Sequence, residues 1–189
     1  MPFPIETERL WVRRFSKDDV DAIRAFTSHL SVASRTPNIP RDDPEKLAQY
    51  ANIQNSIELF AKGMCVDLAI ERKPDSRVLG LVTLVSNGNR QGEIGWALGP
   101  EYRGRGYATE AARGLMEFAF RDCEYHRIFA NTGLANDRSW KVMERLGMRK
   151  EGHFREAQPP AEPGGPWRDT VRYAVLASEF WERELCSRS

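Results

Sequence analysis

The chain has 189 residues, of which 41% are hydrophobic and 29% are charged, and its formal net charge at pH 7 is +1. This composition is typical of a folded domain and excludes a disordered or fibrous chain, and we expect residues 1–189 to form a single domain. Because the charge is nearly neutral and no basic run is present, neither nucleic acid nor an anionic membrane is expected as a partner.

The three cysteines, Cys65, Cys123 and Cys186, are odd in number and show no Cys-x-x-Cys spacing. A disulfide framework and a metal site are therefore not expected. The N-terminus lacks the apolar segment of a signal peptide, and no apolar run approaches the ~20 residues of a membrane helix. The sequence predicts a cytoplasmic protein without membrane contact, and we expect a monomer or a homodimer.

The first third of the chain predicts one strand, two helices and a loop. Residues 8–15 mix apolar side chains with arginines, which is typical of an edge strand. Ser16 precedes acidic residues and an amphipathic pattern, so it predicts the N-cap of a first helix. A proline-containing loop is expected over 34–43. Pro44 then opens a second helical pattern that ends at Gly63.

The rest of the chain alternates apolar strand-like runs with helical patterns, separated by turns rich in Gly, Pro, Asn and Asp. Strands are predicted at 65–71, 78–85, 93–98, 127–132, 148–154 and 170–176, and helices at 108–121, 136–146 and 178–185. This order predicts a mixed α/β fold with one mixed sheet and helices on both of its faces.

A glycine-rich turn lies between a predicted strand and a predicted helix, with the sequence Arg103-Gly104-Arg105-Gly106-Tyr107-Ala108. Glycines let the backbone approach a ligand, and the unpaired amides at a helix start attract anions. Arg103 and Arg105 add positive charge, so a pyrophosphate would suit the site. The turn lacks the Lys of a Walker loop and the third Gly of a dinucleotide motif. A solvated loop is the alternative interpretation.

A second motif opens the predicted helix at 136–146. Asn136 suits the N-cap position, and Ser139 lies three residues later on the same helix face, above Val142 and Met143. Two polar groups therefore meet at one end of an apolar face. Alternatively, Asn136 only caps the helix and Ser139 is an ordinary residue of its first turn.

Together the two motifs resemble the GNAT superfamily of N-acetyltransferases. The glycine-rich turn matches its Arg/Gln-x-x-Gly-x-Gly/Ala pyrophosphate loop, and the second motif matches its Asn-x-x-Ser…Leu-Gly-Phe segment, with Met148 where Phe is usual. Residues 6–10 followed by Arg13, and the stretch from Gly152 to Tyr173, resemble the branch that acetylates ribosomal-protein N-termini. The resemblance covers nearly the whole chain. It implies a twisted mixed sheet of about six to seven strands.

The resemblance implies acetyl-CoA as co-substrate, no metal, and backbone amides that bond the thioester carbonyl. We predict Glu93 as the base and Ser139 as the donor to the departing thiolate; a solvated Glu93 is the alternative. The residues expected to bind acetyl-CoA are Trp96, Ala97, Leu98, Arg103, Gly104, Arg105, Gly106, Tyr107, Ala108, Thr109, Asn136 and Ser139.

The acceptor is expected to be a protein N-terminal α-amine. A small-molecule amine (an antibiotic, a polyamine or an amino-acid derivative) is an alternative, and so is a CoA-binding module without catalysis. The segment from Gln158 to Pro166 is richer in proline than the family's usual turn. We expect this segment to be a loop at the acceptor site, with a surface insertion as the alternative.

Overall fold

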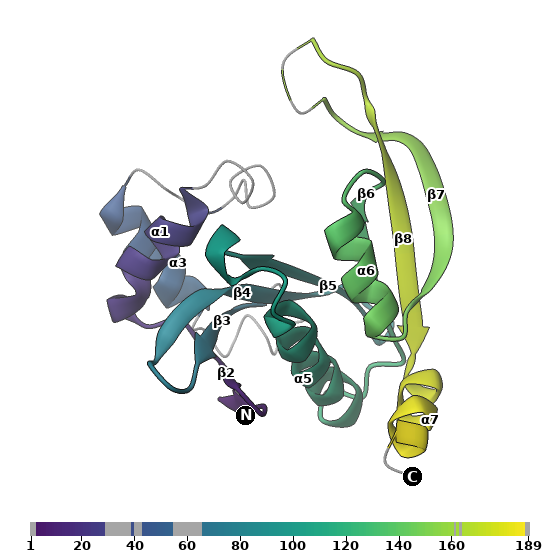
Figure 1. Cartoon of the computed structure of the whole chain (residues 1–189), viewed down its shortest axis with the longest axis horizontal. Coiled ribbons are helices and arrows are strands. Elements are labelled where there is room, and N and C mark those ends of the chain that lie inside the picture. The colour runs from purple at the N-terminus through teal and green to yellow at the C-terminus, as the bar shows by residue number, and fades with distance from the viewer. Residues whose placement is uncertain are drawn as a thin grey trace.

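The computed structural model describes residues 3–28, 39, 43–54, 66–160, 162 and 164–187. Most of the expected loop at 34–43 and the end of the second predicted helix lie outside these residues. The elements, all labelled in Figure 1 except β1, are β1 (Ile5–Glu6), β2 (Leu10–Arg13), α1 (Val20–Thr27), α3 (Pro44–Gln54), β3 (Val66–Arg72), β4 (Arg77–Ser86), β5 (Gln91–Leu98), α5 (Tyr107–Arg121), β6 (Arg127–Gly133), α6 (Asp137–Arg145), β7 (Arg149–Gln158), β8 (Arg168–Leu176) and α7 (Ala177–Ser187).

The strands form one eight-stranded sheet in the order β1-β2-β3-β4-β5-β6-β8-β7. Only β5 and β6 run parallel, so the sheet is mixed, as predicted. The count exceeds the expected six to seven because the two-residue strand β1 pairs Ile5 with Val12. The prediction that residues 8–15 form an edge strand is wrong, because β1 pairs with β2 and itself lies at the edge of the sheet.

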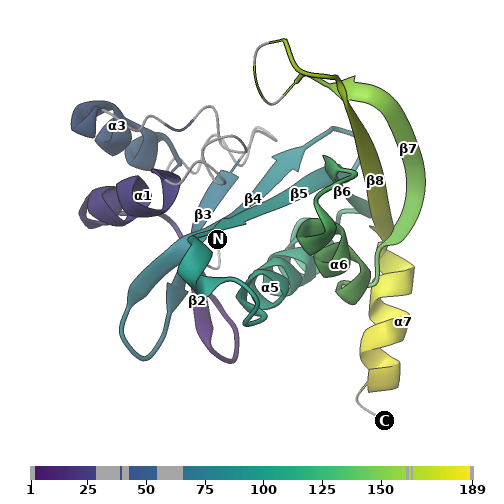
Figure 2. The same cartoon turned by 45° about the horizontal axis from the view of Figure 1, so that its top comes forward.

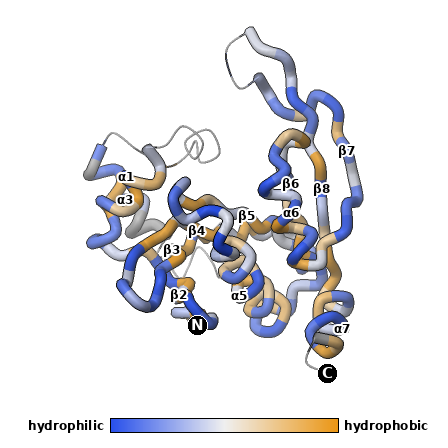
Figure 3. Tube along the Cα trace, in the orientation of Figure 1, coloured by the Kyte–Doolittle hydropathy of each residue, from blue (hydrophilic) through white to orange (hydrophobic). Residues whose placement is uncertain are grey.

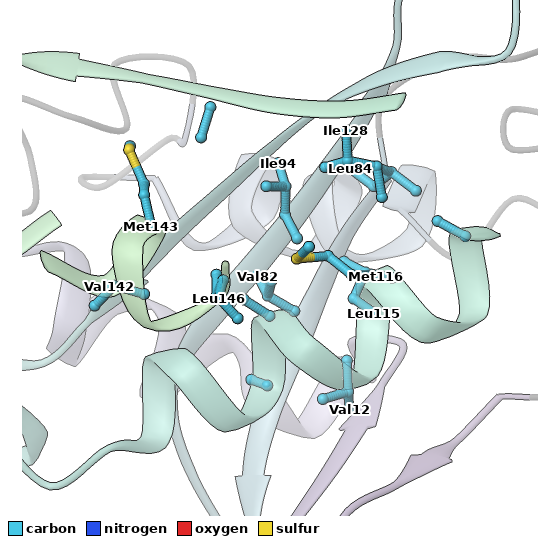
Figure 4. Packing of buried hydrophobic residues seen from close by; sticks show 14 of the residues in the cluster. Val12, Val82, Leu84, Ile94, Leu115, Met116, Ile128, Val142, Met143 and Leu146 are labelled. Atoms are coloured by element: carbon cyan, nitrogen blue, oxygen red, sulfur yellow. The ribbon is translucent and has the colours of Figure 1, made fainter. Parts of the chain in front are cut away.

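Helices cover both faces of the sheet, as predicted. Successive side chains of β4 point to opposite faces of the sheet. Leu81 packs in a core with α1 and α3, whereas Val82 packs in a second core with α5 and α6. Figure 4 shows the second core, where Ile94 of β5 lies near Leu115 and Met116 of α5. Figure 2 shows the pair α1 and α3 well separated from α5 and α6.

Strands β5 and β6 separate part-way along their length. β5 pairs with β4 from Gly92 to Leu98, but its pairing with β6 stops at Glu93. The second half of β5 therefore has one edge that β6 does not cover. This gap lies beside the N-terminal ends of α5 and α6, and it positions the site described below.

Strands β7 and β8 form a long hairpin whose tip extends beyond the rest of the protein (Figures 1 and 2). β7 runs to Gln158 rather than to the predicted end at Phe154, so the described residues of the proline-rich segment lie at the tip of this hairpin. Figure 3 shows a largely hydrophilic β7, consistent with its exposed position at the sheet edge. Within the described part of the chain, no helix is both long and apolar enough to span a membrane.

Candidate active site

A first hollow of about 1030 Å³ lies between the end of β5, the start of α5 and one face of α6. The predicted glycine-rich turn forms part of its wall. Gly104 and Gly106 have φ values of 75° and 82°, which glycine adopts without strain. The first intrahelical bond of α5 runs from Glu110 N to Gly106 O, so the amides of residues 107–109 precede the helical ladder. The turn therefore has the geometry of an anion site.

The N-terminal segment fixes this turn through Glu110. Thr7 Oγ1 and Arg9 N each donate to Glu110 Oε1 at 2.7 Å, and Arg9 Nε donates to Oε2 at 2.7 Å. Arg9 Nη1 also donates to the carbonyl of Arg105 at 3.1 Å, and its guanidinium lies 4.7 Å from the centre of the Tyr107 ring. Residues 6–10 were predicted only as a family signature, so this clamp, formed by Thr7 and Arg9 on Glu110, was not predicted from the sequence.

Basic side chains from α6 also face the first hollow. Arg138, Lys141 and Arg145 all line it, and their spacing places them on one helix face. Lys141 pairs with Asp137 at 2.8 Å, whereas no ion pair within the described residues involves Arg138, Arg145 or Arg105. The hollow thus has excess positive charge, which suits a polyphosphate. These α6 residues were not predicted, although their spacing in the sequence was visible.

A second hollow of about 1200 Å³ opens on the face of the sheet that carries Thr83 and Glu93. It also includes Gln158 and Pro159 at the base of the hairpin tip. The residues that line both hollows are Trp96, Ala97, Arg103, Asp137, Arg138 and Ser139. The two hollows therefore meet where β5 separates from β6.

Ser139 lies at this junction, with its side chain oriented by Asn136. Asn136 Nδ2 donates to Ser139 Oγ at 2.7 Å and to Thr132 Oγ1 at 2.8 Å. Asn136 occupies the predicted N-cap position, but its side chain does not cap the helix, so that detail of the prediction is wrong. Because Ser139 Oγ accepts from Asn136, its own proton can be donated elsewhere.

The backbone of β5 presents amides to the same junction. Gly99 N donates to Leu79 O at 3.0 Å on the β4 side, while the carbonyl of Leu98 accepts from Arg103 Nε at 3.1 Å on the other side. Since successive strand residues alternate in direction, the amides of Trp96 and Leu98 point away from β4, into the gap. Ala97 also lines both hollows, but its amide points toward β4.

Glu93 lines the second hollow, where its side chain is half-buried. Asn131 Nδ2 donates to Glu93 Oε1 at 2.9 Å. The carboxylate therefore shares the second hollow with Ser139, whereas the glycine-rich turn lines the first hollow. The residues predicted to bind acetyl-CoA all line the first hollow except Asn136, which lines the second.

Residues 9–149 match the model of the acetyltransferase (GNAT) domain. The chain belongs to the GNAT family. It is 32% identical to the Bacillus subtilis N-acetyltransferase YnaD over 177 residues, which are 93% of this chain and 98% of that protein. A GNAT-family acetyltransferase structure from Bacillus anthracis covers 92% of this chain and 98% of its own, with a TM-score of 0.77 and 28% identity.

Two further relatives carry substrate names. The Escherichia coli ribosomal protein uS5-alanine N-acetyltransferase is 32% identical over 87 residues, 46% of this chain and 43% of that protein. The Escherichia coli spermidine N(1)-acetyltransferase is 26% identical over 108 residues, 56% of each chain. The family assignment makes this GNAT protein an acetyl-CoA-dependent N-acetyltransferase, which agrees with the predicted activity.

Proposed function

We propose that this GNAT enzyme transfers the acetyl group of acetyl-CoA to a protein N-terminal α-amine bound in the second hollow. The observation that carries the proposal is the junction of the two hollows at Trp96 and Ser139. A donor held on the α5 side of the sheet and an acceptor held on the Glu93 side would meet there. The uncovered edge of β5 provides the passage between them.

The first hollow would hold the donor. The pyrophosphate of CoA would bind the amides at the start of α5, with added positive charge from Arg105 and Arg138. The thioester would lie along β5, where the amides of Trp96 and Leu98 can donate to its carbonyl oxygen. Such preorganised donors stabilise the charge that develops on this oxygen during attack.

The reaction needs a neutral amine. An α-amine has a pKa of about 7.7–8.0, so a modest base is sufficient near neutral pH. The nitrogen lone pair attacks the thioester carbon, the C–N bond forms, and the surplus amine proton passes to Glu93, directly or through water. Collapse of the tetrahedral intermediate breaks the C–S bond. The thiolate is then protonated through the Ser139 hydroxyl, which takes up a proton from solvent as it gives up its own, and Glu93 releases the amine proton to solvent.

The charges of the second hollow favour an α-amine over a polyamine. Its acidic residues are Glu93, Asp137 and Asp169; Asp137 pairs with Lys141, and Asp169 bonds His153 at 2.6 Å. Its basic residues are Arg103, Arg138 and Arg168, which balance the acids in number. A polycation would need several uncompensated carboxylates, whereas one α-amine needs a single base.

A thiol-release assay with acetyl-CoA tests the proposal. We expect turnover with a peptide that begins with alanine and carries a free α-amine, and none with the same peptide after α-N-acetylation. Mass spectrometry should place the new acetyl group on the α-nitrogen. Turnover with spermidine or an aminoglycoside, but not with such peptides, would overturn the choice of acceptor.

A further inference from the structure

A chain of three polar side chains crosses three neighbouring strands and ends at Glu93. Arg172 of β8 donates from Nε to Asn131 Oδ1 at 2.9 Å, and Asn131 of β6 donates from Nδ2 to Glu93 Oε1 at 2.9 Å. Arg172 and Asn131 lie directly opposite each other in the β6–β8 ladder. The geometry of the sheet thus brings a guanidinium, an amide and a carboxylate into line.

The two neighbours of Asn131 determine which way its amide faces. The Arg172 guanidinium can only donate a hydrogen bond, so the Asn131 atom that faces it must be the oxygen. The NH₂ group then faces Glu93, whose carboxylate can accept. Arg172 therefore fixes the orientation in which Asn131 serves as a donor to Glu93.

Arg172 is itself held by aromatic rings. Its guanidinium carbon lies 4.7 Å from the centre of the Phe129 ring and 5.4 Å from that of Phe154. Both distances are within the range of a cation–π contact. Phe129 is the residue of β6 that pairs with Glu93 of β5, so the ring also packs beside the base.

We propose that Asn131 and Arg172 are positioning residues that hold the Glu93 carboxylate toward the second hollow. Within the described part of the chain, Asn131 is the hydrogen-bond partner of Glu93, which fixes one carboxylate oxygen and leaves the other to accept the amine proton. Without this bond the side chain could rotate among its rotamers, and fewer molecules would present the base correctly. The inference rests on the proposed role of Glu93 as base.

A double-mutant cycle on kcat tests the coupling between Asn131 and Glu93. We expect Asn131→Ala to lower kcat about tenfold, as misplacement of a reacting group does, with an unchanged KM for acetyl-CoA because Asn131 does not line the donor hollow. In a Glu93→Gln background, Asn131→Ala should lower kcat no further. Effects of equal size in both backgrounds would overturn the inference.

Asn131→Asp separates positioning from packing. This variant keeps the side-chain size and still accepts from Arg172, but its ionised carboxylate cannot donate to Glu93, so kcat is measured at a pH high enough to ionise both carboxyl groups. We expect its kcat to fall at least as far as that of Asn131→Ala, while its Tm stays near that of the wild type. Wild-type kcat in Asn131→Asp would show that Asn131 only supports packing, and would contradict the proposal.

Arg172→Met has a matched control in Arg127→Met. Arg127 also stacks on Phe129, at 5.2 Å, and it bonds Gln91 and Glu151 rather than Asn131. We expect kcat to fall only in Arg172→Met, and this fall to disappear in the Glu93→Gln background. Equal losses in the two variants would contradict a specific role for Arg172.

The Glu93→Gln variant separates a failure of this inference from a failure of the proposed base. If Glu93→Gln alone retains wild-type kcat, the base assignment fails together with this inference. If Glu93→Gln lowers kcat but shows no coupling to Asn131 and Arg172, the base assignment stands and only this inference fails.

Discussion

In the proposed mechanism, two polar side chains at the start of α6 would together protonate the leaving group. Asn136 donates both of its amide protons, to Ser139 and to Thr132, and so holds the Ser139 hydroxyl with its own proton available. The thiol of CoA has a pKa of roughly 8.5 by analogy with Cys, so its departure gains only moderately from protonation. On this proposal Ser139 would act on one chemical step, and CoA binding would depend on it much less.

Replacing Ser139 separates this role from that of an ordinary helix residue. We expect Ser139→Ala to lower kcat about 10- to 1,000-fold, the range of a positioned proton donor, because the thiolate loses its donor. The affinity for CoA, measured by calorimetry, should change much less. If Ser139→Ala turns over at the wild-type rate, Ser139 is only a residue of the first helical turn.

Part of the candidate site could be predicted because its residues lie close together in the sequence at characteristic spacings. The glycines of the turn and the pair Asn136 and Ser139 are close in sequence, so their local geometry follows from helix periodicity. The chain Arg172–Asn131–Glu93 was not predictable, because its members meet only through strand register. The direction of the Asn136 side chain also depends on Thr132, which lies on another element.

The first turn of α5 depends on the connection between β1 and β2, which is far away in the sequence. Glu110 accepts hydrogen bonds from Thr7 and Arg9, and Arg9 also donates a hydrogen bond to the carbonyl of Arg105. Burial alone would raise the pKa of Glu110, but the bonds from Thr7 and Arg9 outweigh it and place the pKa below its usual value of 4.5. The ionised carboxylate therefore stabilises the folded protein and holds the glycine-rich turn in place.

The clamp gives the stability of the protein a specific pH dependence. Because the pKa of Glu110 is lower in the folded state, its contribution is fully present above pH 4.5 and is lost as the pH falls through the folded value. We expect Glu110→Gln to lower Tm by about 2–4 °C at pH 7, with a smaller difference at pH 3.5. Thermal unfolding at both pH values checks this, with the exposed Glu182→Gln as control. An equal difference at both pH values would mean that the charge is not what stabilises the clamp.

Strands and helices were predicted with boundaries within a few residues because their hydrophobic periodicities are strong. The helix predicted at 108–121 is α5 (Tyr107–Arg121), and the strand predicted at 127–132 is β6 (Arg127–Gly133). β1 was missed because two residues carry no periodicity. The greater length of β7 was missed because its exposed polar sequence resembles a loop.

In the proposed arrangement, the two substrates would bind in hollows on opposite sides of one sheet. The order of the strands puts the single parallel pair, β5 and β6, in the middle, and their separation opens a passage through the sheet. Neither strand order nor strand separation is encoded in any local pattern, and only a twisted mixed sheet was predicted from the sequence. Assignment of residues 1–189 to a single domain remains a prediction, as does cytoplasmic location.

The most direct test of this arrangement is the affinity of a bisubstrate ligand, measured by calorimetry. The ligand joins the sulfur of CoA through a –CH₂–CO– link to the α-nitrogen of an alanine-initiated peptide, so it fits only if both hollows and the gap beside Trp96 are occupied at once. We expect it to bind at least about 100-fold more tightly than CoA alone, because the second part binds intramolecularly. An affinity equal to that of CoA alone would contradict the account, since it would show that the peptide part does not reach the second hollow.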